Sequence, residues 1–371
     1  MTGLAVLSLV VFAAPQQLGA APAAAPAAAE PAAARLQRVV DDYFEELLKL
    51  NPILATSIGD PRYNDRYVVS IAPDVRAADE RLERDFLARI GTVDRAALSE
   101  SDRITYDVFK SGREREIEGF RFRDDLIPLN QFYSVPNSFA QLGSGNGLQP
   151  FKTVKDYDDF LKRIDGFVAW TNQAIVNMRE GVKQGYTLPR VLTERVLPQL
   201  DAHLVAKPEE SLYWGPVNRM PADFAAADRE RLTAAYRTAI ETKIVPSYRK
   251  LRDYMRDEYL PKCRTTVGLD ALPDGKAWYE YRVREITTTD YTPAQIHAIG
   301  LKEVARIRGE MQGVMTQVGF KGSLDDFFKF LNSDPQFFYP DKESLIAGYD
   351  DIRKRVNPQL PKLFEVLPKA D

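Results

Sequence analysis

The stretch from Trp278 to Ile307, WYEYRVREITTTDYTPAQIHAIGLKEVARI, gives the clearest indication of the fold. It starts with aromatic and β-branched residues, which favour strands, and passes through three threonines into a helix. Thr292 can cap this helix, Pro293 suits its first position, and Gln295 can close a capping box. The stretch therefore predicts a short β segment near 278–290 that leads into a long helix.

The predicted helix carries a stripe of apolar residues at helical spacing. The stripe consists of Ile296, Ile299, Val304, Ile307, Met311, Val314 and Val318. Such a stripe is typical of a helix that packs one face against a core. We therefore expect the stripe to be buried, and we interpret the extended arm and the capped helix as a structural joint.

Helical periodicity dominates the rest of the chain as well. The predicted helices cover 36–48, 77–90, 101–120, 154–185, 191–204, 222–259 and 324–331, and Asp341 caps a last one. Pro246 should kink or divide the longest of them, because proline removes a backbone donor. Between 124 and 150 the sequence is rich in Pro, Asn, Gln and Gly, which predicts a long irregular loop of the kind that is often functional. The fold class is mainly α, a large multi-helix bundle.

Length and charge exclude several classes of protein. A chain of 371 residues allows about two lobes, or one large helical domain. Its 50 basic and 53 acidic residues give a net charge of -3, so we expect no nucleic-acid partner. Cys263 is the only cysteine, which excludes an intramolecular disulfide and a cysteine-based zinc site.

The N-terminal residues are typical of an exported protein. An apolar run from Leu4 to Ala14 is too short to span a membrane and predicts a signal peptide over 1–20. Residues 21–35 are almost entirely Ala and Pro and predict a disordered linker, so that the helical domain covers 36–371. We expect a secreted or periplasmic protein with no membrane span after signal cleavage.

No complete catalytic or metal-binding motif is present in the sequence. A zinc hydrolase needs at least three converging ligands, but the chain has only His203 and His297, and no glutamate follows either. A lone histidine at the edge of an apolar helix face is more often a packed residue than a ligand. The sequence therefore predicts neither catalytic nor metal-ligating residues in this chain.

Other local patterns have structural interpretations that compete with functional ones. Ser247 and Lys250 match S-x-x-K, but the companion S-D-N and K-T-G elements are missing, which favours coincidence. The glycines from Gly143 to Gly147 could offer amides to an anion, yet they lack the lysine of a phosphate-binding loop. Trp278, Tyr279 and Tyr281 could line a groove, although such aromatic residues more often supply core.

The same opening stretch also carries a family resemblance. YEYRVREITTTDYTPAQIHAIGLKEVARI closely resembles the bacterial DUF885 family, a domain of unknown function. Further matches are GDPRYNDR from Gly59, PLNQF from Pro128, GYTLPRVLTERVLPQL from Gly185 and LPDGKAWY from Leu272. The resemblance thus extends over essentially the whole chain after the linker.

The resemblance implies a helical zinc peptidase of the gluzincin type. Its metal-binding helix, similar to HEA-x-PGHH, belongs to the C-terminal half of longer members, and the chain ends before such a segment. We therefore expect the N-terminal, substrate-groove portion of a secreted zinc-peptidase-like hydrolase, incomplete at its C-terminus and inactive alone. Zinc is implied for the full-length family member, and no ligand is assigned in this chain.

The polar lining of such a groove is predicted from the family-like segments next to irregular backbone. The predicted residues are Asn130, Gln131, Tyr133, Arg190 and Tyr279. Their partner would be a peptide or small-molecule substrate. A non-catalytic periplasmic binding or scaffold protein stays open as the alternative, because the residues present include no catalytic constellation.

Overall fold

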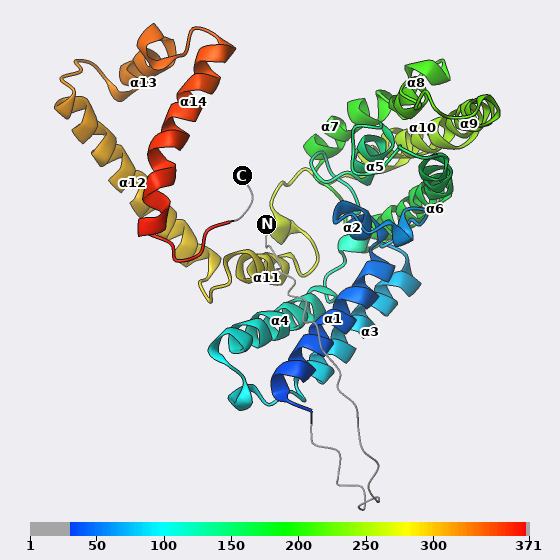
Figure 1. Ribbon diagram of the computed structural model, residues 1–371, viewed down its shortest axis with the longest axis horizontal. Helices are drawn as coiled ribbons and strands as arrows, with labels where there is room; N and C mark the ends of the chain where they lie inside the picture. Colours follow the sequence, from blue (N-terminus) through cyan, green and yellow to red (C-terminus); the bar gives the residue numbers. More distant parts are fainter. Residues whose placement is uncertain (1–29, 369–371) are drawn as a thin grey trace, which may run out of the picture. The chain divides into compact units, whose positions relative to one another are not determined.

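The computed structural model describes residues 30–368, and helices dominate this range (Figure 1). Within these residues the β structure is limited to one isolated bridge between Pro189 and Arg264. The prediction of a mainly α, multi-helix fold is confirmed. The α-helices are α1 (Ala32–Leu50), α2 (Pro52–Ser57), α3 (Pro73–Ile90), α4 (Glu100–Gly119), α5 (Val135–Gly143), α6 (Val154–Gln184), α7 (Arg190–Asp201), α8 (Gly215–Asn218), α9 (Ala226–Ala239), α10 (Val245–Tyr254), α11 (Gly275–Thr287), α12 (Pro293–Gln317), α13 (Leu324–Ser333) and α14 (Lys342–Val356).

Contacts divide the described chain into two compact units, here called unit 1 (30–285) and unit 2 (286–368). Unit 1 holds α1 to α10 and most of α11, whereas unit 2 holds α12 to α14. Nearly all of the buried apolar residues belong to unit 1. The cavities described below also lie in that unit.

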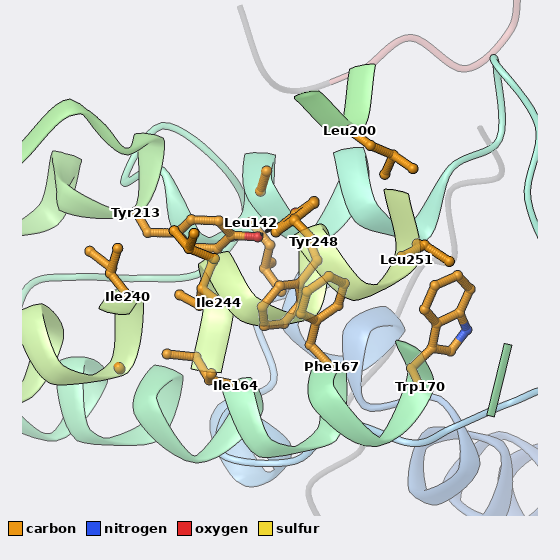
Figure 2. Packing of buried hydrophobic residues seen from close by; sticks show 14 of the residues in the cluster. Leu142, Ile164, Phe167, Trp170, Leu200, Tyr213, Ile240, Ile244, Tyr248 and Leu251 are labelled. Atoms are coloured by element: carbon orange, nitrogen blue, oxygen red, sulfur yellow. Dashed lines mark hydrogen bonds between the residues drawn. The ribbon is translucent and has the colours of Figure 1, made fainter. Parts of the chain in front are cut away.

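The main core of unit 1 is organised by α6, a helix of 31 residues. Thr153 and Asp156 close a capping box at its start, and Gly185 ends it with a left-handed φ of 83°. Apolar residues recur along one face, which is buried against the neighbouring helices. Figure 2 shows this packing; the labelled residues are Ile164, Phe167 and Trp170 of α6, Ile240, Ile244, Tyr248 and Leu251 from the stretch that ends in α10, and Leu142, Leu200 and Tyr213.

The interruption predicted at Pro246 takes the form of a π-helical turn. This turn covers Ile240–Ile244 and joins α9 to α10, and the Val245 N–H bonds to the Ile240 carbonyl. A π turn widens the helix by one residue, which accommodates a proline that has no N–H of its own to donate. The chain therefore continues as a helix through Pro246.

A second apolar cluster joins α1, α3 and α4 and fixes the helices beside the candidate site. Within it the Tyr43 hydroxyl donates to the Glu83 carboxylate at 2.8 Å. The Arg113 guanidinium lies 3.8 Å from the Tyr43 ring centroid and forms an ion pair with Glu83. Burial raises the pKa of Glu83, and both contacts oppose that shift. Paired in this way, a buried carboxylate can be kept inside a small core.

The guanidinium of Arg163 on α6 is fully buried and ties four chain segments together. Its Nε donates to the Arg66 carbonyl at 3.0 Å, and it also donates to the Gln149 side chain. Further bonds run to the Thr56 hydroxyl at 2.6 Å and to the Tyr63 carbonyl at 3.0 Å. Burial lowers the pKa of Arg163 to about 10. These neutral acceptors replace the water that the cation has lost.

Replacing Arg163 with Met should reduce the free energy of unfolding by about 3–5 kcal/mol, because several buried acceptors would lose their donor. Arg231→Met is the matched control, since Arg231 forms a half-exposed pair with Asp158 and should contribute at most about 1 kcal/mol. Urea unfolding followed by circular dichroism measures both. Equal small losses would show that the buried network does not hold unit 1 together.

The predicted β segment near 278–290 is wrong, because α11 is helical from Gly275 to Thr287. Trp278 and Tyr281 lie about one helical turn apart and both contact Phe122, at ring distances of 5.7 and 5.1 Å. Burial of these two rings on one helix face outweighs the strand preference of their residue types. The interpretation of this aromatic cluster as core is confirmed for Trp278 and Tyr281, which are also next to a cavity, and is wrong for Tyr279, which is exposed on the other face of α11.

The irregular loop predicted over 124–150 is correct only in part, because its middle forms α5. Phe139 and Leu142 of this helix are buried in the main core. Their spacing of three residues suits a helix, but the surrounding Pro, Asn and Gly residues concealed it. Gly143 ends α5 where a Cβ would stand 2.2 Å from Phe160, so this glycine permits close packing.

Unit 2 confirms the predicted helix start and contradicts the predicted burial. The Thr292 hydroxyl and the Gln295 side chain form the expected capping box of α12. The apolar stripe is largely exposed, however: Val304 keeps 55% and Ile307 41% of their surface, whereas Met315 is buried. The periodicity identified an apolar face correctly but could not show that the other helices of unit 2 leave most of it uncovered.

Alanine substitutions along α12 should separate its exposed stripe from its buried position. Val304→Ala and Ile307→Ala should change the free energy of unfolding by no more than about 0.5 kcal/mol, because these side chains have little contact to lose. Met315→Ala should lower it by about 2 kcal/mol or more. Thermal unfolding of the three variants is the measurement, and a large loss for Val304→Ala or Ile307→Ala would contradict the exposed arrangement.

Candidate functional site

Unit 1 contains a cavity of about 570 Å³ between α3, α4, α11 and the segment from 122 to 133. We call it the acidic-aromatic cavity. Its size falls in the range of sites that hold small ligands, about 300–1,000 Å³. The cavity lies beside the small core of α1, α3 and α4, so its walls come from helices that are already fixed by packing.

Aromatic rings form one side of the acidic-aromatic cavity. Phe122 stacks on Trp278 with a ring distance of 5.7 Å, and Tyr281 contacts Phe122 at 5.1 Å. The Tyr281 hydroxyl donates to the Arg115 carbonyl at 3.1 Å and so joins α11 to α4. Gly119 permits this close approach, because a Cβ there would stand 2.6 Å from the Tyr281 oxygen.

Carboxylates also line the cavity, and two of them have no ion-pair partner within residues 30–368. Asp79 of α3 and Glu116 of α4 both line the cavity. Burial raises the pKa of Asp79, with Arg76 and Arg113 opposing the shift. Burial also raises the pKa of Glu116, and Asp79 adds to it by repulsion. Glu116 keeps much of its surface in solvent, whereas Asp79 is half-buried, so Asp79 is the less solvated of the two carboxylates.

The other charged groups of the cavity are paired. Arg76 lies 2.7 Å from the Asp124 carboxylate, and Arg123 holds Asp125 at 2.9 Å. Arg282 lies 2.6 Å from the Glu285 carboxylate. These contacts pair the other charges, so that within residues 30–368 Asp79 and Glu116 are the two unpaired carboxylates that line the cavity.

The loop from Asn130 to Ser134 forms the lip of the cavity. The Asn130 side-chain oxygen accepts from the N–H groups of Phe132 and Tyr133, both at 2.8 Å. The Gln131 carbonyl accepts from Gln199 of α7 at 3.1 Å. The loop is therefore tied down, although Phe132 and Tyr133 remain 83% and 84% exposed. Fixed, exposed aromatic residues at the mouth of a cavity can contact a ligand without further ordering.

The structure brings only some of the five predicted groove residues together. Asn130 and Tyr133 line the acidic-aromatic cavity, and Gln131 belongs to the same loop without lining it. Arg190 lies at the start of α7 and pairs with Glu194 at 2.9 Å. Tyr279 is 49% exposed on α11 and does not line the cavity.

Sequence reasoning missed Asp79 and Glu116 as site residues. Both occur in helices crowded with charged residues, where an acidic side chain is normally on the solvated face. The local pattern carries no signal that singles them out. Their meeting depends on how α3 packs on α4, which is a tertiary property.

The described residues do not fit the zinc site that the family resemblance implies. Within residues 30–368, no group of three or more His, Cys, Asp or Glu residues is placed to hold a metal ion. His203 packs on the Tyr248 ring at 4.3 Å, and burial lowers its pKa. His297 is exposed on α12, in the other unit.

The S-x-x-K match is also engaged in structure. The Ser247 hydroxyl donates to the Lys243 carbonyl at 2.7 Å, and the Lys250 amine donates to Asn172 at 2.6 Å. A nucleophile must contact its activating base, and these two side chains have separate partners. The interpretation of this match as coincidence agrees with the geometry.

The fold and the cavity together define an all-helical protein with a candidate ligand site in unit 1. In a comparison with protein families, residues 52–371 match the family described as "Bacterial protein of unknown function (DUF885)". The chain belongs to this family. No helix within residues 30–368 has the length and apolar content needed to cross a membrane.

A solved structure shares this fold. It is a protein from Colwellia psychrerythraea named as a candidate lipoprotein, with a TM-score of 0.77 and 19% sequence identity. The match covers 92% of this chain and 61% of that chain, so the chain spans about three fifths of its length. None of the curated proteins compared with the chain matches it.

Replacing Asp79 with Asn should stabilise the protein at neutral pH. Because burial raises the pKa of Asp79, the folded state holds this proton more tightly than the unfolded state. The associated stability is present below the ordinary aspartate pKa of about 4 and is lost as pH rises through the folded pKa. Asparagine cannot ionise, so the gain of Asp79→Asn should appear at pH 7 and vanish near pH 3.

Thermal unfolding from pH 3 to 8 measures this effect. Asp74→Asn, an exposed change in the same helix, should show no comparable gain at neutral pH. A loss of stability for Asp79→Asn at pH 7 would mean that the carboxylate makes a stabilising contact instead.

Proposed function

We propose that this chain forms the substrate-groove portion of a secreted zinc-peptidase-like hydrolase, and that the acidic-aromatic cavity is part of the groove. The observation that carries the proposal is the position of Asn130 and Tyr133, which line the same cavity as the unpaired Asp79 and Glu116. The match over residues 52–371 shows membership of the DUF885 family. The zinc-peptidase-like activity is what the family resemblance implies.

The cavity favours a ligand with a positively charged group. Asp79 and Glu116 form no ion pair within residues 30–368, although Arg113 acts on both from a distance, and an ammonium or guanidinium group would supply a direct partner. A peptide can present such a group at its N-terminus or on a lysine or arginine side chain, so a basic peptide fits the site.

The hydrolytic step is not assigned to any residue of this chain. The resemblance implies a zinc ion that would polarise the scissile carbonyl and activate water in a longer family member. The residues that we assign here bind and orient the substrate: Tyr133 offers a surface at the mouth, and the carboxylates hold a charged end. Positioning of this kind raises the rate of a reaction carried out by groups elsewhere.

The alternative is a non-catalytic periplasmic binding or scaffold protein. It is favoured by the engagement of His203 and Ser247 in packing and in backbone bonding. Both proposals expect binding in the cavity, and they differ in turnover. Peptide cleavage assays with added zinc on a longer family member separate them: turnover that falls when residues matching Asn130 and Tyr133 are changed supports the hydrolase, and binding without turnover supports the alternative.

Alanine substitutions at the lip test the cavity as a binding site. Asn130→Ala would release the loop, and Tyr133→Ala would remove its exposed ring, so each should weaken binding of an Arg- or Lys-containing peptide by about tenfold, or 1.4 kcal/mol. Isothermal titration calorimetry on the purified chain gives the affinities. Tyr279→Ala is the matched control, because Tyr279 is an exposed tyrosine outside the cavity lining.

Two results would contradict this assignment. The first is equal weakening by all three variants, which would indicate a general effect on the fold. The second is unchanged affinity for Asn130→Ala and Tyr133→Ala, which would place the peptide site elsewhere.

A further inference from the structure

Unit 1 contains a second cavity, of about 680 Å³, that shares no lining residue with the first. We call it the apolar cavity. Its walls come from α2, from α5 and from the end of the following loop, and they include Ile53, Val135, Phe139, Leu142 and Leu148. Its size suits a small ligand, and its aliphatic and aromatic lining favours an apolar one.

Tyr67 lines the apolar cavity together with three other polar residues, Asn137, Ser138 and Gln141, and it is the one that combines a large apolar ring with a hydroxyl. Its ring contacts Phe139 edge-on at 5.3 Å. Within residues 30–368 its hydroxyl makes no hydrogen bond, and burial raises its pKa. The backbone beneath is closely packed, because a Cβ at Gly166 would stand 2.4 Å from the Tyr67 Cβ. A fixed hydroxyl without a partner can donate a hydrogen bond to a ligand in the cavity.

Arg163 holds the walls of the apolar cavity in place. Three of its acceptors lie close in sequence to a lining residue: Thr56 belongs to α2 with Ile53, Arg66 precedes Tyr67, and Gln149 follows Leu148. The apolar cavity is therefore built by the same buried network that stabilises unit 1. Preorganised walls of this kind reduce the entropy lost when a ligand binds.

The charge of Arg163 also determines which head group suits the cavity. The guanidinium bonds only to neutral oxygens, and the nearest carboxylates are already paired, Asp159 with Lys155 and Asp65 with Lys162. Its field favours negative charge at Tyr67. A ligand whose head group is anionic and accepts a hydrogen bond would satisfy the Tyr67 hydroxyl and the positive potential together.

From these observations we propose that the apolar cavity binds a medium-chain carboxylate. The hydrocarbon chain lies against α2 and α5, and the carboxylate accepts a hydrogen bond from the Tyr67 hydroxyl. This site is independent of the proposed peptide groove, since the two cavities have different linings. The expected ligand has an apolar body and one carboxylate head group. A free fatty acid has this chemistry, and so does a peptide that ends in an apolar residue.

A chain-length series tests the apolar part of the proposal. Hexanoate, octanoate and decanoate are titrated into the purified chain below their micelle concentrations, with calorimetric detection. Affinity should rise about fourfold for each added methylene, because each one is transferred from water to the cavity. An acetyl peptide ending in leucine tests the second source of the same chemistry. Equal affinity across the three acids would overturn the proposal.

Two variants test the location of the site. Tyr67→Phe removes the hydroxyl and keeps the ring, and it should weaken decanoate about tenfold while the dependence on chain length remains. Ser138→Trp places a bulky ring at the exposed rim of the cavity and should abolish binding. Ser101→Trp, at an exposed position on α4, is the matched control and should bind like the parent chain.

The outcomes distinguish this proposal from that of the peptide groove. Unchanged decanoate binding in both Tyr67→Phe and Ser138→Trp would overturn the proposal, as would a stoichiometry well above one, which indicates adsorption. Asn130→Ala and Tyr133→Ala should leave decanoate affinity unchanged whether or not the peptide groove exists. Circular dichroism of each variant shows that a loss of binding is not a loss of fold.

Discussion

The buried guanidinium of Arg163 is the constraint on which unit 1 depends. A cation without water is costly, and it is stable here because carbonyl, hydroxyl and amide oxygens surround it. Those oxygens come from α2, from the turn after it and from the loop before α6, and the first two segments lie about 100 residues before Arg163 in the sequence. The requirement to satisfy one side chain thus fixes the path of three segments over α6.

The same principle operates about four turns further along α6, at Asn177. Its side-chain amide donates to the Ile71 carbonyl at 2.8 Å and to the Asp125 carbonyl at 3.1 Å. Ile71 and Asp125 both line the acidic-aromatic cavity. The helix α6 therefore supports both cavities through polar side chains within a mostly apolar face: Arg163 at one and Asn177 at the other.

The helices could be predicted from the sequence because their information is local. The capping box at Thr292 and Gln295 needs only four residues, and the interruption at Pro246 follows from one. Burial was harder to predict, as the exposed Val304 and Ile307 show, because periodicity reveals an apolar face but not what covers it. The helical α11 was missed because tertiary packing of Trp278 on Phe122 overrides strand propensity.

The candidate sites depended still more on tertiary information. Asn130 and Tyr133 could be selected because they occur in irregular backbone within a family-like segment. Asp79 could not, since nothing near it in the sequence distinguishes a carboxylate that faces a cavity from one that faces solvent. Only the packing of α3 on α4 makes that difference.

Unpaired polar groups are informative in this protein only when they meet a cavity. Within residues 30–368 the Trp170 indole nitrogen and the Thr171 hydroxyl are buried without a hydrogen-bond partner, yet neither residue lines either of the two cavities, so each represents a modest penalty of core packing. Asp79 and the Tyr67 hydroxyl differ because each adjoins a space large enough for a ligand. A polar group that destabilises the fold and faces such a space is stabilised when a complementary ligand binds there. The presence of both an unpaired polar group and an adjoining cavity therefore distinguishes a binding site from a packing defect.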